Sequence, residues 1–316
     1  MLETRKQIDL SVIIPTKDRE QDLLECLDSL FKQKFFPREI IIVDQSTIKI
    51  SPEKLQSIIP SSVESTYIYD PNISGATQAR NIALGQAKGE KVLLLDDDII
   101  LLDNSLDNLL SIFDKDIGGE IAGVGGSATN EAPSLLQLVG VKLFCHGPFS
   151  FWNNQITFDH KAKNSSNVLM RSSIIPAGAS CVKTEVFKNF RFDENLVGYT
   201  HGDDSIFGYQ ASSKYKFFLY SGFRFYHKKR SQATKDKGKN IERQIVWWFY
   251  FFNKYVKKTA FNTLCYAWSF FGIFLKVVIS FYDLKVLRGA FRGWRRILFL
   301  IVKKVPVDQY IKVTSL

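Results

Sequence analysis

Cysteine is scarce in this sequence of 316 residues. The four cysteines, Cys26, Cys145, Cys181 and Cys265, lie far apart, and none belongs to a CxxC pair. This spacing argues against a disulfide framework and against a zinc knuckle, and it suits a reducing compartment. The N-terminal stretch also lacks the long apolar core and the small-residue cleavage site of a secretory signal, so we expect the protein to face the cytosol.

Internal repeats, low-complexity segments and nucleic-acid recognition motifs are missing too. Acidic residues are scarce only in the C-terminal part. Residues up to His227 include 23 Lys+Arg and 28 Asp+Glu, whereas residues from Lys228 onward include 19 Lys+Arg and 4 Asp+Glu. The net charge of +10 therefore belongs to the tail, where basic residues sit among large apolar ones, an arrangement that argues against nucleic acid as a partner. The apolar content of 45% is ample for a packed core.

Over the first half, short β-branched runs alternate with stretches of helical period, which is typical of an α/β sheet. The predicted strands cover residues 10–15, 39–44, 65–70, 91–98 and 120–126, and the predicted helices cover 22–31 and 75–89. Residues 127–170 show little periodicity, so we expect loops there that shape a substrate pocket. A strand, a glycine turn and a helix are predicted over 174–190, a helix start at 203–204 and a last strand at 223–227. Because strands of an open α/β sheet present their carboxyl ends to one crevice, their polar ends should converge.

One stretch, KVLLLDDDIILLD at residues 91–103, sets three carboxylates directly against a buried apolar run. Adjacent like charges repel one another and lose hydration on burial, so a positive group is expected beside them. Because side chains alternate across a strand, Asp96 and Asp98 should share one side while Asp97 points away. Such a pair suits a hard divalent cation, Mg²⁺ or Mn²⁺, that also binds substrate phosphates. Two alternatives stay open: Asp98 caps the following turn, or the segment forms an acidic pocket of the response-regulator type.

Five segments, in this order and at these spacings, resemble the family 2 glycosyltransferases of the GT-A fold. They are LSVIIPTKDR, EIIIVDQS, GATQARNIALGQAKGE, VLLLDDD and GDDSIFGYQ, and the similarity covers about residues 8 to 230. Members of that family transfer a sugar from a nucleotide-sugar to an acceptor hydroxyl. The resemblance implies a catalytic domain over residues 1–230, built as a mixed, Rossmann-like sheet flanked by helices.

The resemblance also implies roles for single residues. Six positions would bind the nucleotide: Pro15, Thr16, Arg19, Asp44, Arg80 and Asp96. Asp44 would accept a hydrogen bond from the base, and the planar fork of Arg80 suits either base or diphosphate. Asp96 and Asp98 would hold the metal, with His227 completing the metal or diphosphate shell. The structural alternatives are that Arg80 is a solvated helix charge and that His227 is a packed or surface residue.

An acidic pair, Asp203-Asp204, stands at a predicted helix start. An Asp at that place is a preferred N-cap and needs no catalytic role, but two acids exceed what one cap requires. The resemblance makes Asp204 the general base and Asp203 a supporting residue on the acceptor side, where the family usually has Glu. A helix N-terminus favours an ionised carboxylate, so Asp204 would be ready to accept a proton.

Residues 231–316 are predicted to form an aromatic and basic helical tail. A charge-free stretch of about 17 residues follows Lys258; it is at the short limit for a spanning helix, so a span around 259–282 is possible but not favoured. Further on, five apolar residues follow helical spacing, with arginines largely elsewhere around the helix: Leu287, Phe291, Trp294, Leu298 and Ile301. That pattern is typical of an amphipathic helix in the headgroup layer of a membrane. The alternatives are packing on the catalytic domain or binding of an acidic partner.

Together these features predict an inverting, metal-dependent glycosyltransferase at the cytoplasmic face of the cell membrane. Its partners would be a nucleoside-diphosphate sugar, a glycan or lipid-linked acceptor, and the membrane surface that the tail binds. The expected setting is cell-surface or lipid-linked polysaccharide synthesis, for example of the rhamnosyl or galactosyl type. A nucleotidyltransferase and an inactive nucleotide-sugar-binding protein are the alternatives.

Overall fold

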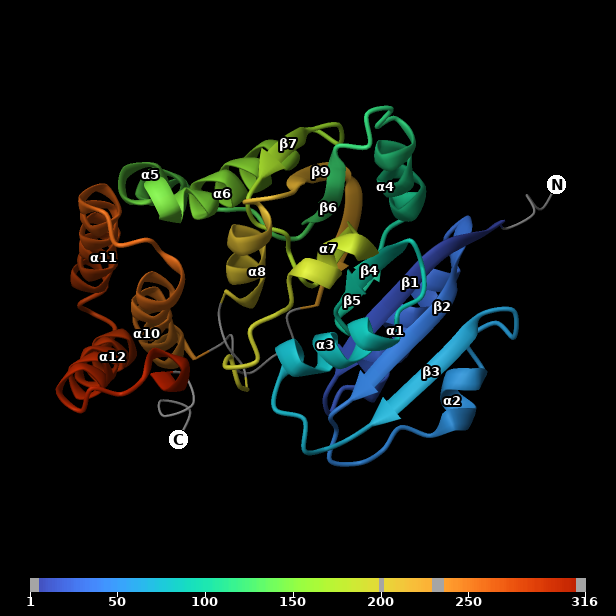
Figure 1. The fold of residues 1–316 in the computed structure, drawn as a ribbon, viewed down its shortest axis with the longest axis horizontal. Helices are drawn as coiled ribbons and strands as arrows, with labels where there is room; N and C mark the ends of the chain where they lie inside the picture. The colour runs from blue at the N-terminus through green and yellow to red at the C-terminus, as the bar shows by residue number, and fades with distance from the viewer. Residues whose placement is uncertain (1–5, 199–201, 229–235, 311–316) are drawn as a thin grey trace.

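Parallel strands form one half of the sheet. The structure, a computed structural model, describes residues 6–198, 202–228 and 236–310 (Figure 1). Within these residues the strands pair in the order β3-β2-β1-β4-β8-β6-β9-β5, and β7 pairs with β9. The parallel half consists of β1 (Lys6–Thr16), β2 (Phe35–Asp44), β3 (Glu64–Tyr69) and β4 (Lys91–Leu95). Its connections carry α1 (Glu20–Phe31), α2 (Pro52–Gln56) and α3 (Ala76–Gln86).

Strands β1, β2 and β4 are buried on both faces along most of their length, as their continuous apolar runs predict, whereas the edge strand β3 is only half-buried. In β4, Leu93 and Leu95 belong to one hydrophobic cluster, whereas Val92 and Leu94 belong to another. Because side chains alternate across a strand, the two clusters lie on opposite faces of the sheet. The parallel strands are thus held rigidly, and so are the turns at their carboxyl ends.

The other half of the sheet is mixed. β8 runs antiparallel to β4 and β6, β6 runs parallel to β9, and both β5 and β7 run antiparallel to β9. The strands are β5 (Ile99–Leu101), β6 (Ile121–Ala128), β7 (Leu169–Ser172), β8 (Ala179–Lys183) and β9 (Lys216–His227). The helices are α4 (Ser105–Asp114), α5 (Leu135–Phe144), α6 (Ser150–Ala162), α7 (Thr184–Asn189) and α8 (Asp203–Ala211), with a 3₁₀ turn η1 (Gly147–Phe149). The mixed α/β sheet flanked by helices is therefore confirmed.

Residues 127–170 are not the loop-rich segment that the sequence predicts, because α5 and α6 occupy much of it. α5 begins at a capping box, in which the Gln137 N–H donates to the Ser134 hydroxyl and the Ser134 N–H donates to the Gln137 side chain. The apolar residues of α5 are spread around the helix and none is fully buried. Without one buried stripe, the period of an amphipathic helix does not show in the sequence.

Three long helices follow β9, and the first of them lies beside α8 (Figure 1). They are α10 (Lys237–Tyr255), α11 (Ala260–Ile279) and α12 (Leu284–Val302), followed by a 3₁₀ turn η2 (Val307–Gln309). One hydrophobic cluster joins Phe151 and Ile206 to Trp247 and Phe251 of α10. Asp193 adds a polar link, because it accepts hydrogen bonds from the Tyr250 and Tyr255 hydroxyls and pairs with Lys254 at 3.1 Å. The tail thus shares a core with the sheet-bearing part; the domain boundary at 230 stays a prediction.

Candidate functional site

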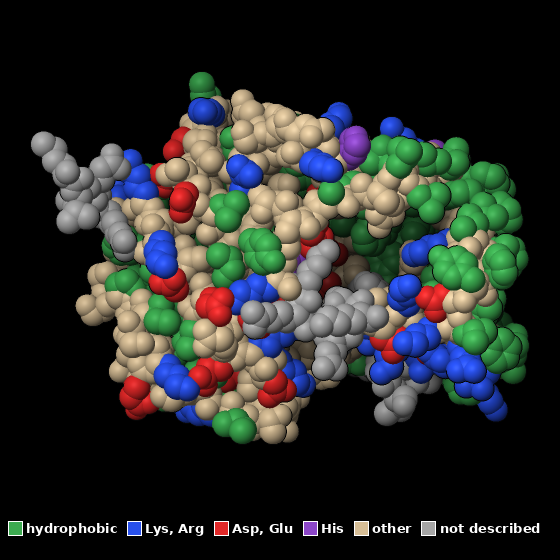
Figure 2. Space-filling view, turned by 180° about the vertical axis from the view of Figure 1, so that it is seen from behind, with side chains coloured by type: hydrophobic (Ala, Val, Ile, Leu, Met, Phe, Trp, Pro, Cys, Tyr) green, Lys and Arg blue, Asp and Glu red, His purple; other side chains and the backbone are tan. Residues whose placement is uncertain are grey.

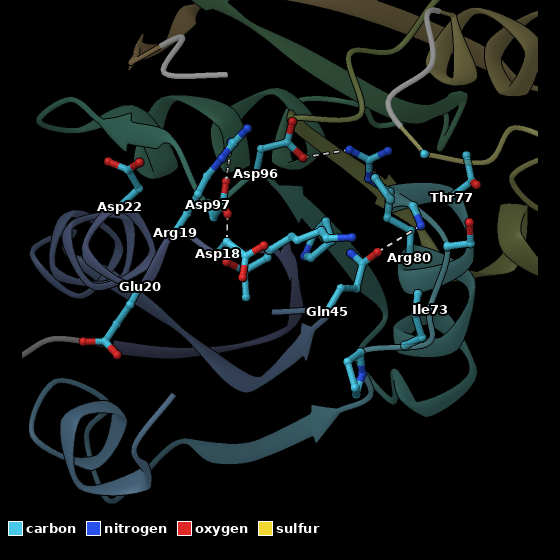
Figure 3. A pocket seen from close by; sticks show the side chains of 18 of the residues that line it. Asp18, Arg19, Glu20, Asp22, Gln45, Ile73, Thr77, Arg80, Asp96 and Asp97 are labelled. Carbon is cyan, nitrogen blue, oxygen red and sulfur yellow. Dashed lines mark hydrogen bonds and ion pairs between the residues drawn. The ribbon is translucent and has the colours of Figure 1, made fainter. Parts of the chain in front are cut away.

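A cavity of about 1280 Å³ opens at the carboxyl ends of the parallel strands (Figure 3). Its volume exceeds the roughly 300–1,000 Å³ of most small-molecule sites, so a nucleotide with an attached group fits. Its lining includes residues that end or follow β1, β2, β3 and β4: Pro15, Thr16, Gln45, Pro71, Asn72, Asp96 and Asp97. The predicted convergence of these polar strand ends is therefore confirmed.

The three aspartates lie in a turn after β4, not in the strand. The Asp96 N–H donates to the Gly178 carbonyl at 2.9 Å, and the Ile99 N–H donates to the Asp96 carbonyl at 3.3 Å. Because the strand ends at Leu95, the alternation of side chains does not extend to the triplet. The prediction that Asp97 points away from the other two is accordingly wrong.

Asp97 and Asp98 share one guanidinium. Arg19 Nη1 lies 3.0 Å from Asp97 Oδ1 and 3.1 Å from Asp98 Oδ2, and the Thr16 hydroxyl donates to Asp97 Oδ2 at 2.8 Å. Burial raises the pKa of Asp97 to about 7, although the Arg19 charge acts in the opposite direction. The positive group expected beside the triplet is present.

Arg80, on α3, joins the two acidic motifs. Its Nη2 lies 2.7 Å from Asp96 Oδ1 and its Nη1 lies 2.5 Å from Asp203 Oδ2. The Arg80 side chain is only 5% exposed, which excludes the alternative of a solvated helix charge. Its Nε is buried without a hydrogen-bond partner among the described residues. A buried donor left unpaired beside a ligand cavity suits a further acceptor from a bound molecule.

Gly178, in the segment before β8, makes room for Asp96. A Cβ at position 178 would lie 2.6 Å from Asp96 Oδ2, which is closer than real Cβ atoms approach. The glycine turn predicted between 174 and 190 therefore has a specific function, because any other residue at position 178 would collide with the Asp96 carboxylate.

Asp98 and His227 lie together beside the cavity. His227 Nε2 is 3.3 Å from Asp98 Oδ1, and His227 Nδ1 is 2.8 Å from Glu131 Oε1. Burial acts to raise the pKa of Asp98, but the hydrogen bond and charge of His227 outweigh it and lower that pKa. Neither residue is among those that line the cavity, but Asp98 pairs with Arg19, which does line it.

Asp44, at the end of β2, is fully buried and does not line the cavity. Its carboxylate accepts hydrogen bonds from the Tyr67 hydroxyl at 2.5 Å and from the Ser46 N–H at 2.8 Å. Its neighbour Gln45 does line the cavity and accepts a hydrogen bond from the Gly75 N–H at 3.0 Å. The contact of Asp44 with a base stays a prediction.

The acidic pair at the start of α8 splits into two environments. Asp203 lines the cavity and pairs with Arg80. Asp204 is not among the residues that line the cavity, and its Oδ1 accepts hydrogen bonds from the Ser205 N–H at 2.7 Å and the Ser205 hydroxyl at 3.3 Å. Burial, and then the negative charge of Asp203, raise the pKa of Asp204 to about 7. Two neighbouring carboxyls with such different partners are suited to different roles.

Oxygen donors dominate this region. Within the described residues no group of three or more His, Cys, Asp and Glu side chains is arranged to hold a metal ion. Mg²⁺, however, usually takes only one or two carboxylates and completes its shell with waters and substrate phosphates. The carboxylates that follow β4 beside the cavity fit that kind of site.

Comparison with known proteins identifies the family. The model of the family described as "Glycosyl transferase family 2" matches residues 11–171. The glycosyltransferase GlyG of Streptococcus pneumoniae is 30% identical over 100 residues, which are 32% of this chain and 33% of that protein. The GalNAc(5)-diNAcBac-PP-undecaprenol β-1,3-glucosyltransferase of Campylobacter jejuni is 33% identical over 102 residues, again 32% of this chain and 33% of that protein. The chain is thus matched over about a third of the length of these curated relatives.

Solved structures extend the likeness in fold to the whole chain. The mannosyltransferase PcManGT of Pyrobaculum calidifontis, solved with GDP-Man and Mn²⁺, superposes with a TM-score of 0.56 at 15% identity and covers 98% of this chain and 86% of its own. At that identity the likeness concerns the fold alone. It confirms the prediction of a GT-A fold.

Proposed function

The chain belongs to glycosyl transferase family 2, and from this premise we propose that it transfers a sugar from a nucleoside-diphosphate sugar to an acceptor hydroxyl. The observation that carries the proposal is the Arg80 guanidinium, which holds Asp96 after β4 and Asp203 at the start of α8 at one cavity. A donor site and an acceptor site must lie side by side for a single displacement. This contact supports that arrangement.

The donor occupies the cavity in this proposal. Pro15 and Thr16 contact the nucleoside, and Asp44, at the end of β2, accepts a hydrogen bond from the base. Arg19 and Arg80 approach the diphosphate, where their planar guanidinium groups match phosphate oxygens. As the sugar leaves, negative charge grows on the diphosphate, and fixed positive groups that already face it stabilise that charge without reorganising.

A divalent cation, Mg²⁺ or Mn²⁺, is the proposed cofactor. Asp96 and Asp98 would hold it, with His227 supporting Asp98 at 3.3 Å. When bound, such an ion neutralises charge on the leaving diphosphate. The oxygen-rich turn after β4 supports this assignment, as does the Mn²⁺ that accompanies GDP-Man in the similar mannosyltransferase structure.

Asp204 is the proposed general base. Its raised pKa, about 7, suits a group that accepts a proton near neutral pH, whereas Asp203 is engaged by the Arg80 guanidinium. Asp204 takes the proton of the acceptor hydroxyl, and the oxygen attacks the anomeric carbon from the face opposite the leaving diphosphate. One displacement inverts that carbon. Asp203 holds Arg80 and supports the acceptor side.

The acceptor is proposed to be lipid-linked, in cell-surface polysaccharide synthesis at the cytoplasmic face of the membrane. The name of the similar Campylobacter protein includes an undecaprenol-linked substrate. Among the described residues α11 is the one helix long and apolar enough to cross a membrane. However, it packs on its own protein through Cys265, Ser269, Ile273 and Val277, which repeat every four residues along its length. We therefore favour a peripheral tail over a spanning one.

The experiment is a donor assay on the full chain. Nucleoside-diphosphate sugars are offered with Mn²⁺, and release of the nucleoside diphosphate is followed with and without candidate acceptors. The proposal expects acceptor-dependent release of the nucleoside diphosphate and no sugar 1-phosphate product. Release of sugar 1-phosphate, with transfer of the nucleoside monophosphate unit, would instead indicate a nucleotidyltransferase, and binding of the donor without any release would indicate an inactive nucleotide-sugar-binding protein.

A further inference from the structure

α5 presents an apolar face to the outside. Leu135, Leu136, Val139 and Leu143 are 75%, 68%, 44% and 53% exposed. Single exposed apolar side chains are ordinary on a protein surface, but four on one helix of ten residues form a patch. Such a patch indicates a surface that another body covers.

α5 and α11 meet at a continuous seam. The Trp268 indole N–H donates to the Leu143 carbonyl at 2.7 Å, and the Ser269 hydroxyl donates to the Phe144 carbonyl at 2.5 Å. The Phe144 ring packs on Trp268 and on Phe271 at centroid distances of 5.3 and 6.3 Å. The exposed faces of α5 and α11 therefore belong to one surface.

That surface continues onto α12, and we call the whole the apolar surface. Besides the α5 residues it includes Phe261, Leu264, Trp268, Phe271, Phe274, Val278 and Ile279 on α11, and Phe291, Leu298, Phe299, Ile301 and Val302 on α12. Figure 2 shows hydrophobic side chains gathered over the end of the molecule that these helices form, with Lys and Arg side chains below them. A contiguous set of exposed apolar side chains of this kind is typical of a surface that docks on a protein or a membrane.

Charge favours an anionic bilayer as the occupant. On the exposed side of α12, Arg288 and Arg295 alternate with Leu284, Phe291 and Leu298. Long basic side chains beside an immersed apolar face reach the headgroups, where anionic lipid attracts them. A second copy of this chain would instead bring two strongly basic tails together.

The predicted stripe on α12 is only partly exposed. Leu287 and Trp294 pack against the hydrophobic cluster that contains Trp247 and Phe251 of α10. Arg292 and Arg296 bind Glu242 at 2.7 and 2.9 Å. The membrane-facing area of the tail alone is thus smaller than the sequence predicts. α5 supplies additional area.

We propose that α5, although it belongs to the sheet-bearing part of the chain, is a membrane-docking element, and that α5, α11 and α12 rest together on an anionic bilayer. The proposal deepens the membrane association given above and depends on it. The proposal also gives the donor cavity an orientation relative to the bilayer. The start of α8 is fixed to the helical tail, because the ring of Trp247 in α10 lies against Gly202 and packs on Trp152 of α6. The acidic pair then lies on the bilayer side of the donor cavity, where a lipid-linked acceptor arrives.

The test measures binding of the full chain to vesicles of phosphatidylcholine with and without phosphatidylglycerol. The variant Leu135→Glu with Leu136→Glu places two charges on α5. The control, Ile48→Glu with Ile117→Glu, adds the same charge at residues that are 82% and 100% exposed outside the apolar surface. We expect wild type and control to bind the anionic vesicles with equal affinity. The α5 variant should bind them at least about ten-fold more weakly, because each substitution removes one leucine side chain that would otherwise be buried in the bilayer.

Two outcomes would overturn the proposal. In the first, the α5 variant binds vesicles as tightly as the control does, but Phe291→Glu weakens binding; the tail alone would then dock on the membrane. In the second, the wild-type protein sediments as a dimer and does not bind vesicles, whereas the α5 variant sediments as a monomer. Thermal stabilisation by uridine diphosphate, measured on every variant, reports the donor cavity independently. A chain that docks but transfers no sugar would contradict only the proposed function.

Discussion

Asp96 and Asp203 bind opposite nitrogens of a single guanidinium, that of Arg80. Asp96 follows a strand of the parallel half of the sheet, whereas Asp203 begins a helix that precedes β9. Two acidic motifs that are distant in the sequence therefore depend on the same buried cation. Any change that displaces Arg80 should affect both.

Replacing Arg80 by Ala should destabilise the fold as well as abolish donor binding. The change leaves Asp96 and Asp203 without their shared cation, and breaking a buried ion pair costs about 3–5 kcal/mol. The measurement is the free energy of unfolding by urea. Arg38, which pairs with Asp9 at 3.4 Å where both side chains are about half exposed, provides the control, because Arg38→Ala should cost no more than about 1 kcal/mol. Equal losses in the two variants would mean that the Arg80 contacts contribute nothing.

Replacing Asp204 by Asn should lower kcat by roughly 10²–10⁴-fold and leave the affinity for the donor nearly unchanged, because the amide cannot accept the acceptor's proton. Donor affinity is measured by calorimetry and turnover by nucleoside-diphosphate release. If Asp204→Asn instead abolished donor binding, Asp204 would be part of the nucleotide site and not the base.

The pH profile provides a separate check on Asp204. Below its pKa of about 7 the carboxyl keeps its proton and cannot act as a base, so kcat/KM should rise as the pH increases through about 7. The residual activity of Asp204→Asn should not show this rise. A wild-type profile that is flat between pH 5 and 8 would argue against the assignment.

Gly178→Ala should disturb the site without altering any charged group. The added methyl would lie 2.6 Å from Asp96 Oδ2, so the carboxylate must move away from Arg80. We expect donor affinity to fall by at least about ten-fold, corresponding to the loss of one good hydrogen bond to a charged group. Gly85→Ala is the matched control: Gly85 lies in the last turn of α3, no atom lies within 4 Å of its new methyl, and the change should stabilise the protein slightly.

Asp98→Ala should remove the Mn²⁺-dependent part of the thermal stabilisation by a nucleoside diphosphate. Ligands that bind only the folded state raise the melting temperature, so the difference between runs with and without Mn²⁺ isolates the contribution of the cation. Asp103→Ala, at an exposed position in the segment before α4, should keep the wild-type difference. An undiminished Mn²⁺ effect in Asp98→Ala would place the cation elsewhere.

Much of the sheet could be predicted from local patterns. Buried parallel strands need continuous apolar runs, and the residues that end those runs, such as Thr16 and Asp96, must lie at one edge because parallel strands share a direction. That reasoning finds the cavity without any knowledge of pairing order. It does not determine where a strand stops, so the alternation assumed for Asp96, Asp97 and Asp98 fails because the strand ends at Leu95.

Other parts of the site depend on long-range contacts that no local pattern contains. The sequence does not single out Gln45 and Gly178, because their importance comes from Gly75 and Asp96, which are brought to them only by the folded sheet. The pairing of Asp97 with Arg19 is likewise evident only in three dimensions. α5 escapes prediction for a different reason, since a helix that is apolar on its outward side as well as on its packed side lacks the one-sided period of a soluble helix.

The hydrogen bonds that Asp193 receives from Tyr250 and Tyr255 have a mechanical consequence. They fasten α10 to the segment between α7 and α8, and the rings of Trp247 and Phe251 fill the space beside Phe151. Severing the chain ahead of α10 would therefore strip aromatic surface from the half that carries the acidic pair, and the remainder should be insoluble. In the proposed docked state, packing between α10 and the sheet-bearing part would accordingly fix the angle between the donor cavity and the bilayer.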